Sequence, residues 1–247
     1  MKKVPTAVAT LVAALLTPLG TVGSAGATPR SLPASIVNLS ARQIANIALA
    51  SARAKGTCTN VSSGASVGLS FGATTESASN SAEQTIHFNA ASAEARLVAG
   101  TAYVKMNAKF IELDFGRSAP QLASRWISLT RADAAYHDVV TGMLLPSVLS
   151  QVLPAGTLSK SKPTTLFGVG VIAISGSANA RLGLTSSKQT MFVSTSAPFL
   201  PVALDAAGRS RGIPTTLTVT FSHWGQGLHV AAPASALPIS ATTLAAG

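Results

Sequence analysis

Cysteine is nearly absent from this chain of 247 residues, and this absence limits its chemistry. Cys58 stands alone, so no intramolecular disulfide can form. The four histidines include no H-x-x-x-H or H-x-H pair, so the converging ligands of a metal site are missing. Aromatic residues make up 5% of the chain and charged residues 11%, without the aromatic-plus-basic pattern of a nucleic-acid binder. We therefore expect no cofactor, no metal and no nucleic-acid partner.

Acidic residues are also scarce. Eight Asp and Glu stand against 18 Lys and Arg, which gives a formal net charge of +10. The basic residues are scattered, and their densest pair is Lys160 and Lys162 in a proline-flanked loop. A dispersed positive charge is typical of a solvated surface that attracts anionic polymers or lipids. The expected charged partner is an anionic membrane surface or a wall polymer.

The one long hydrophobic run lies at the N-terminus, where it has the pattern of a secretory signal. Lys2 and Lys3 precede the apolar segment VATLVAALLTPLG, and small residues lead to a cleavage site after Ala27. Pro18 and Gly20 interrupt the run, which is too short to span a bilayer. No L-x-x-C motif stands at the cleavage site. The sequence thus predicts a protein exported to the extracytoplasmic cell envelope, with residues 1–27 removed and no lipid anchor.

The remaining residues suit a single domain over residues 28–235, followed by a loose tail over residues 236–247. A chain of about 220 residues buries roughly 70% of its surface, so it needs no disulfide or metal to fold. Residues 38–56 predict a helix. Ser40 and Gln43 form a capping box, and Gly56 suits the left-handed C-terminal cap.

Alternation of polar and apolar residues predicts strands on both sides of a helical centre. We expect strands at 66–71, 84–90, 93–100 and 101–107, the last two forming a hairpin about Gly100. Helices follow at 108–116, 132–144 and 146–153, with a short strand at 125–130. Strands return at 165–176, 180–186, 189–195, 201–207, 215–225 and 228–233. This order predicts an α+β fold, with one large antiparallel sheet and its helices on one face.

A possible catalytic motif is GASVG at residues 64–68, which fits the G-x-S-x-G pattern around Ser66. Asp138, Asp205, His223 and His229 follow in the chain order of an α/β-hydrolase. Such a nucleophile needs a strand that stops at the serine and a helix that starts there. The next segment, LSFGATT, alternates like a strand instead. A secreted serine esterase using Ser66 therefore remains the disfavoured alternative.

The segment FSHWGQGLHVAAP, residues 221–233, holds His223, Trp224 and His229. Gly225 and Gly227 lie between the histidines, where bends are expected. We interpret the segment as a late strand in which the Trp224 indole packs and Gly225 bends the chain. On this interpretation the histidines are exposed and form no site.

Five segments, taken in order, carry a resemblance to a known family. They are GTAYVKMNAKF, SRWISLTRADAAYHDV, LFGVGVIAISG, MFVSTSAPFLPVAL and TFSHWGQGLHVAAP, and they span roughly residues 40–235. The set resembles the LppX/LprG-type lipoproteins of actinobacterial envelopes, relatives in fold of the LolA/LolB carriers. This chain departs from that family in lacking the lipobox cysteine.

The resemblance implies a half-barrel: a strongly curved antiparallel sheet with helices across its concave face. It also implies an apolar cavity between sheet and helices that accepts lipid or glycolipid acyl chains, and no catalysis. Hydrocarbon needs no polar motif, because each buried methylene contributes about 0.8 kcal/mol. From the expected facing of helices and strands, the cavity residues are Ile47, Val104, Met106, Phe110, Leu145, Val148, Leu149 and Phe192. A monomer is expected. A further alternative is an envelope interaction or sensing module without a ligand.

Overall fold

The computed structural model describes residues 33–116 and 118–242, and these residues form one sheet with helices along one side. The predicted signal peptide, residues 1–27, lies outside the described residues. Thirteen strands make the sheet, in the order β13-β6-β5-β4-β3-β2-β1-β12-β11-β10-β9-β7, with β8 paired to β9. Every pairing is antiparallel except that of β13 with β6. The sheet is curved and unclosed, so the predicted α+β half-barrel is confirmed.

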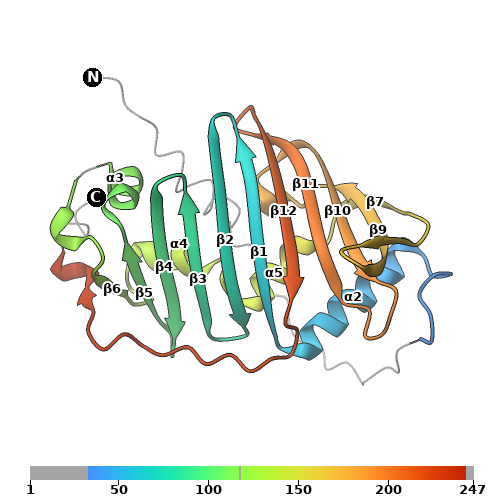
Figure 1. The fold of residues 1–247 in the computed structure, drawn as a ribbon, viewed down its shortest axis with the longest axis horizontal. Coiled ribbons are helices and arrows are strands. Elements are labelled where there is room, and N and C mark those ends of the chain that lie inside the picture. Colours follow the sequence, from blue (N-terminus) through green and yellow to red (C-terminus); the bar gives the residue numbers. More distant parts are fainter. Residues whose placement is uncertain (1–32, 117, 243–247) are drawn as a thin grey trace.

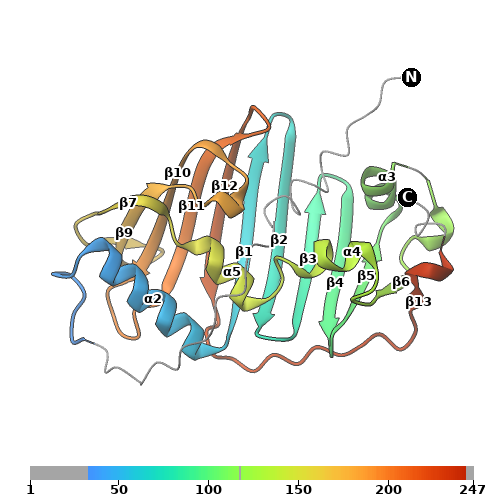
Figure 2. The same ribbon diagram turned by 180° about the vertical axis from the view of Figure 1, so that it is seen from behind.

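The strands hold more of the described chain than the helices do. They are β1 (Thr57–Ser66), β2 (Leu69–Ala78), β3 (Ala82–Phe88), β4 (Ala91–Val98), β5 (Thr101–Met106), β6 (Trp126–Leu129), β7 (Ala155–Lys160), β8 (Thr164–Leu166), β9 (Val169–Ser177), β10 (Thr185–Ser194), β11 (Pro201–Ser210), β12 (Ile213–Ser222) and β13 (Leu237–Pro238). The α-helices are α2 (Ala41–Lys55), α3 (Ala108–Phe115), α4 (Ala134–Val140) and α5 (Leu145–Val152). Helices α2, α4 and α5 run across the same face of the sheet, which is its concave face (Figure 2).

Helix α2 begins and ends where its sequence predicts. The Ser40 side chain accepts from the backbone N–H of Gln43, whose side chain accepts from the backbone N–H of Ser40. Gly56 takes the left-handed conformation at the C-terminus, with φ of 75°. Helix α3 is capped in the same way, because the Asn107 side chain accepts from Phe110 N at 2.8 Å.

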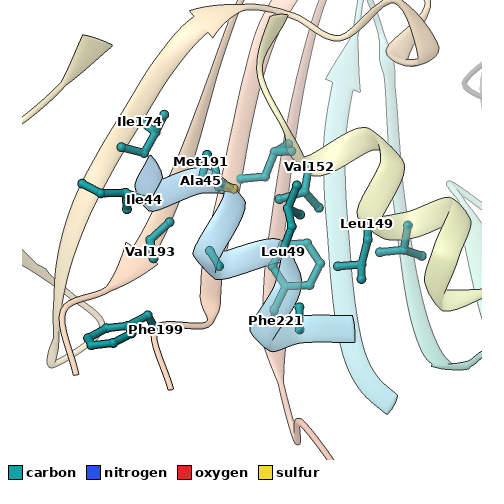
Figure 3. Packing of buried hydrophobic residues seen from close by; sticks show 14 of the residues in the cluster. Ile44, Ala45, Leu49, Leu149, Val152, Ile174, Met191, Val193, Phe199 and Phe221 are labelled. Atoms are coloured by element: carbon teal, nitrogen blue, oxygen red, sulfur yellow. The ribbon is translucent and has the colours of Figure 1, made fainter. Parts of the chain in front are cut away.

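The apolar core is divided into two clusters on the concave face. The α2–α5 cluster joins those two helices to strands β9 to β12 (Figure 3); its large members include Ile44, Leu49, Leu149, Val152, Ile174, Met191, Val193, Phe199 and Phe221. The α3–α4 cluster joins the other two helices to strands β4 to β6, and it includes Leu97, Val104, Met106, Ile111, Ile127, Leu129, Tyr136 and Met143. The centre of the sheet lies between them.

Four predicted strands are wrong in detail, and glycine conformation explains three of them. Residues 165–176, predicted as one strand, form the β8–β9 hairpin, which turns at Gly168 with φ of 78°. Residues 66–71 hold a tight turn between β1 and β2, where Gly68 has φ of 73°, and β1 itself was not predicted. Residues 180–186 begin with a 3₁₀ turn, Ala180–Leu182, that Asn179 caps and Gly183 ends at φ of 62°. Residues 228–233 are an irregular segment and not a strand.

The C-terminal part of the chain packs against the sheet. After β12, residues 223–236 pass along the ends of the strands, from β12 to β6 (Figure 1). Gly225 N donates to Thr57 O, and the Arg96 guanidinium donates to Ala231 O. Strand β13 then pairs with β6 and covers an otherwise open edge. This differs from the loose tail expected over residues 236–247, of which residues 243–247 lie outside the described part.

Candidate functional site on the concave face of the sheet

Strand register identifies the residues that face the helices at the centre of the sheet. Cys58 of β1 pairs with Ser77 of β2, which pairs with Ala82 of β3. Cys58 belongs to the α2–α5 cluster and Ala82 to the α3–α4 cluster, so this row points to the helices. Side chains two residues further along a strand point the same way. The next rows on the concave face are therefore Asn60–Thr75–Gln84, Ser62–Ala73–Ile86 and Gly64–Phe71–Phe88.

The last two rows form a surface that we name the central strip: Ser62, Gly64, Phe71, Ala73, Ile86 and Phe88. All of these except Phe88 are only half-buried. Ala73 and Ile86 belong to neither apolar cluster. The row through Ile86 continues over Ala93 of β4 to Met106 of β5, so small and apolar side chains extend across five strands. At a strand spacing of about 4.8 Å, this row is about 19 Å long.

Aromatic rings make up one end of the central strip. The rings of Phe71 and Phe88 contact each other with centroids 5.8 Å apart. The Phe71 ring also lies over Gly64, where a β-carbon would come within 2.6 Å of its Cε1 atom. Glycine at position 64 thus makes the room that the Phe71 ring occupies.

Polar side chains bound the strip at its other end. The Gln84 amide donates to Thr75 Oγ1 at 2.8 Å, and Thr75 is 2% exposed. Ser77 is fully buried and donates to the carbonyl oxygen of Met143 at 2.7 Å. This bond fixes the segment between α4 and α5 over the sheet. It thereby holds the two helices on opposite sides of the central strip.

The structure divides seven of the eight predicted cavity residues between the two clusters. Leu145, Val148 and Leu149 are buried in the α2–α5 cluster, and the half-buried Ile47 packs against it. Val104 and Met106 are buried in the α3–α4 cluster, with half-buried Phe110 against it. The structure thus places these seven residues in the two clusters beside the centre, and their part in a lipid cavity stays a prediction. The sequence did not point to the central strip between the clusters, where Ser62, Gly64 and Ala73 carry no apolar signal.

Phe192 is the residue that the structure does not bring to this region. It lies in β10 between Met191 and Val193, both fully buried in the α2–α5 cluster. Because successive side chains of a strand point to opposite faces, Phe192 points to the convex side. A shift of one residue in the expected facing of β10 explains the difference.

Ser66 does not sit in a nucleophile elbow. It is the last residue of β1 and leads through a two-residue turn into antiparallel β2, with no helix after it. Its hydroxyl lies 3.4 Å from Thr215 Oγ1. His223 follows Ser222, which pairs with Thr59 at the far end of β1, about 24 Å away at 3.4 Å per residue. Asp205 Oδ1 accepts a hydrogen bond from the hydroxyl of Thr218, so this carboxylate does not orient a histidine as the acid of a catalytic triad would.

A small cavity of about 170 Å³ lies at that far end, lined by residues that include Cys58, Glu76 and His223. Its volume is below the roughly 300–1,000 Å³ of ordinary ligand pockets. Burial raises the pKa of the Cys58 thiol to about 12, although the neighbouring Asn60 side chain acts to lower it. The thiol therefore stays protonated at neutral pH and is no nucleophile. Within the described residues, no three His, Cys, Asp or Glu side chains are placed to hold a metal ion.

The geometry defines a class of fold: a large, curved, mainly antiparallel sheet that is open at its edges and carries helices across one face. Solved structures that share this fold include LprF and LppX. LprF from Mycobacterium bovis matches with a TM-score of 0.51 and 15% identity, over 79% of this chain and 97% of that one. The lipoprotein LppX from Mycobacterium tuberculosis matches with a TM-score of 0.51 and 14% identity, over 77% and 98%.

This chain therefore has the fold of LprF and LppX over most of its length and nearly all of theirs. At these identities the likeness concerns the fold alone. No protein-family model and no curated protein sequence matches the chain. Among the described helices, none has the length and apolar character needed to cross a membrane.

Proposed function

We propose that this chain is an exported, non-enzymatic protein of the cell envelope that binds the acyl chains of a lipid or glycolipid on the concave face of its sheet. The observation that carries the proposal is the central strip, where apolar side chains lie half-buried between two packed clusters. Burial of such surface contributes about 25 cal/mol per Å² without directed polar groups. A hydrocarbon chain is the ligand that this chemistry suits.

The ligand would lie along the half-buried part of the row, Ser62, Ala73 and Ile86, which is about 10 Å long at a strand spacing of about 4.8 Å. Ala93 and Met106 continue the row but are each 5% exposed and packed in the α3–α4 cluster, so they would close its end. Val148 of α5 and Phe110 of α3 belong to the walls on either side. The shared fold with LprF and LppX, the second of them a lipoprotein, supports a place in the cell envelope. The family resemblance of the sequence supports the same ligand class.

The test is organic extraction of the purified protein followed by mass spectrometry of the lipids released. We expect co-purifying lipid in the wild type. Ala73→Trp should remove most of it, because the indole would fill the central strip. Thr74→Trp is the matched control, since Thr74 is exposed and points to the convex face. Absence of both co-purifying and exchangeable lipid, or equal loading of the two variants, would contradict the proposal.

A serine esterase using Ser66 is not favoured by any observation of the site. A fluorophosphonate probe checks this directly: we expect no label at Ser66, and Ser66→Ala should leave any background labelling unchanged. The remaining alternative is a ligand-free interaction module. Pull-down of a specific partner by a protein that carries no lipid would favour that module.

A further inference from the structure

Three exposed apolar side chains gather at one end of the sheet. Val67 lies in the turn between β1 and β2 and is 76% exposed. Leu69 begins β2 and is 38% exposed, and Ile213 begins β12 and is 44% exposed. Ser66 pairs with Thr215, so the β1–β2 and β11–β12 hairpins lie side by side. Figure 1 shows both turns together at the upper edge of the sheet. We name Val67, Leu69 and Ile213 the double-hairpin tip.

Positive charge lies on the strands beside this tip, with Arg209 and Lys188 on the convex face of the sheet and Leu69 and Ile213 on the concave face. Arg209 and Arg211 belong to the β11–β12 hairpin, and Lys188 faces the same strand through its pairing with Ala207. All three side chains are exposed, and none forms an ion pair with any carboxylate of the described chain. Arg209 donates to Gly212 O at 2.7 Å, which holds its guanidinium against the turn.

Carboxylates lie away from the tip. Asp205 is the acidic residue of β11, four residues before Arg209, and its Oδ1 already accepts from Thr218. Glu112, on α3 at the same edge of the sheet, is paired with Lys109. Helix α3 packs against β4, and two strands, β2 and β3, separate β4 from β1. The tip therefore combines exposed aliphatic groups with cations that form no ion pair within the described residues. The nearest acid is Asp205, the diagonal cross-strand neighbour of Lys188.

This combination matches the chemistry of an anionic lipid bilayer. Aliphatic side chains enter the boundary between headgroups and acyl chains, while Arg and Lys remain among the anionic headgroups. The opposite end of the sheet also exposes apolar side chains, Phe167 at 70% and Val169 at 38%. Lys160, which precedes them in the chain, donates from its ammonium to the carbonyl oxygens of Val37 and Leu39. A variant at Phe167 therefore distinguishes docking at the two ends.

We propose that the double-hairpin tip docks the protein on an anionic membrane surface. Docking in this orientation would bring the Gly64–Phe71 end of the central strip toward the bilayer, since Phe71 is two residues from Leu69 on the same face. That second point rests on the proposed lipid-binding function; the docking itself does not.

Co-sedimentation with vesicles tests the docking. The purified protein is mixed with vesicles of phosphatidylcholine alone or with added phosphatidylglycerol. We expect binding to the anionic vesicles only, and weaker binding as salt is raised. The double variants V67S/I213S and R209Q/R211Q should each lower the binding constant for anionic vesicles about ten-fold. Each inserted apolar side chain and each cation near the headgroups contributes separately to the free energy of membrane binding.

Phe167→Ser is the matched control, an exposed apolar turn residue at the other end of the sheet. It should bind as the wild type does, and far-UV circular dichroism should show all variants folded. Wild-type binding by both double variants, loss of binding in Phe167→Ser alone, or binding to anionic wall polymer but not to vesicles would overturn the proposal. Ala73→Trp separates the two functions, because it should lose co-purifying lipid and keep vesicle binding.

Discussion

The ring of Phe71 occupies the space that a side chain at Gly64 would need. The two residues pair across β1 and β2, and a β-carbon at Gly64 would meet the Phe71 ring and, at 2.5 Å, the carbonyl oxygen of Thr216. Glycine weakens a strand by itself, so an aromatic ring placed over it restores buried contact. This pair forms one end of the central strip.

Gly64→Ala should therefore lower the free energy of unfolding by about 1–3 kcal/mol, the usual cost of overpacking. Denaturation by urea measures it. Gly72→Ala is the control from the neighbouring strand, because a β-carbon there would meet only Ser62 O at 3.6 Å. Replacing Phe71 by Leu in the Gly64→Ala background should recover part of the loss. Equal effects at Gly64 and Gly72 would contradict the steric account.

Trp224 is expected to contribute more to stability than its neighbour His223. Its indole packs on Phe221 with ring centroids 5.8 Å apart and donates to Pro201 O at 3.2 Å, whereas His223 is exposed. Trp224→Ala should cost about 3 kcal/mol, as large core truncations do. His223→Ala should change stability by less than about 0.5 kcal/mol. Thermal unfolding of both variants checks this, and a larger loss at His223 would reopen the possibility of a site there.

The sequence predicted best those features that depend on neighbouring residues. The capping box of Ser40 and Gln43, the left-handed cap at Gly56 and the hairpin about Gly100 were all predicted, because each is a local arrangement. The α+β order followed from the alternation of polar and apolar residues. The tight turn at Gly68 was missed because Val67 and Leu69 continue an alternating pattern although both are exposed.

The candidate site was predicted only in part. Its walls are made of large apolar residues such as Leu149 and Met106, which periodicity reveals. Its floor is made of Ser62, Gly64 and Ala73, which become a site only because pairing with β2 and β3 places them beside Phe71 and Ile86. Long-range register of this kind cannot be read from one segment. The facing of Phe192 was wrong for the same reason, since a shift of one residue reverses it.

Cys58 should be chemically inert in the folded protein. Burial raises the pKa of its thiol to about 12, so at about pH 8 roughly one molecule in ten thousand carries the reactive thiolate. We expect no alkylation by iodoacetamide under native conditions and complete alkylation in urea, measured by intact mass. Rapid labelling of the native protein would show that the thiol reaches solvent.

Asp114 should make the protein less stable as pH rises. Burial, and secondarily repulsion from Asp138, raises the pKa of the Asp114 carboxyl from 3.8 to about 6. The folded state then binds the proton more tightly than the unfolded state does. The free energy of unfolding therefore falls between about pH 4 and pH 6, and by linkage the loss is at most about 3 kcal/mol.

Asp114→Asn removes the ionisable group, so the difference between the variant and the wild type reports the effect of Asp114 ionisation on stability. The variant should match the wild type near about pH 4 and exceed it in stability above about pH 6, as measured by urea unfolding across that range. Asp138→Asn should give a smaller gain in stability above about pH 6. It removes the repulsion between the two carboxylates, which is the lesser cause of the raised Asp114 pKa, but leaves the Asp114 carboxyl buried. Glu112→Gln on the exposed side of the same helix is the control and should show little difference at either pH. A gain for Asp114→Asn that does not vary with pH would mean that the substitution acts through packing and not through the buried charge.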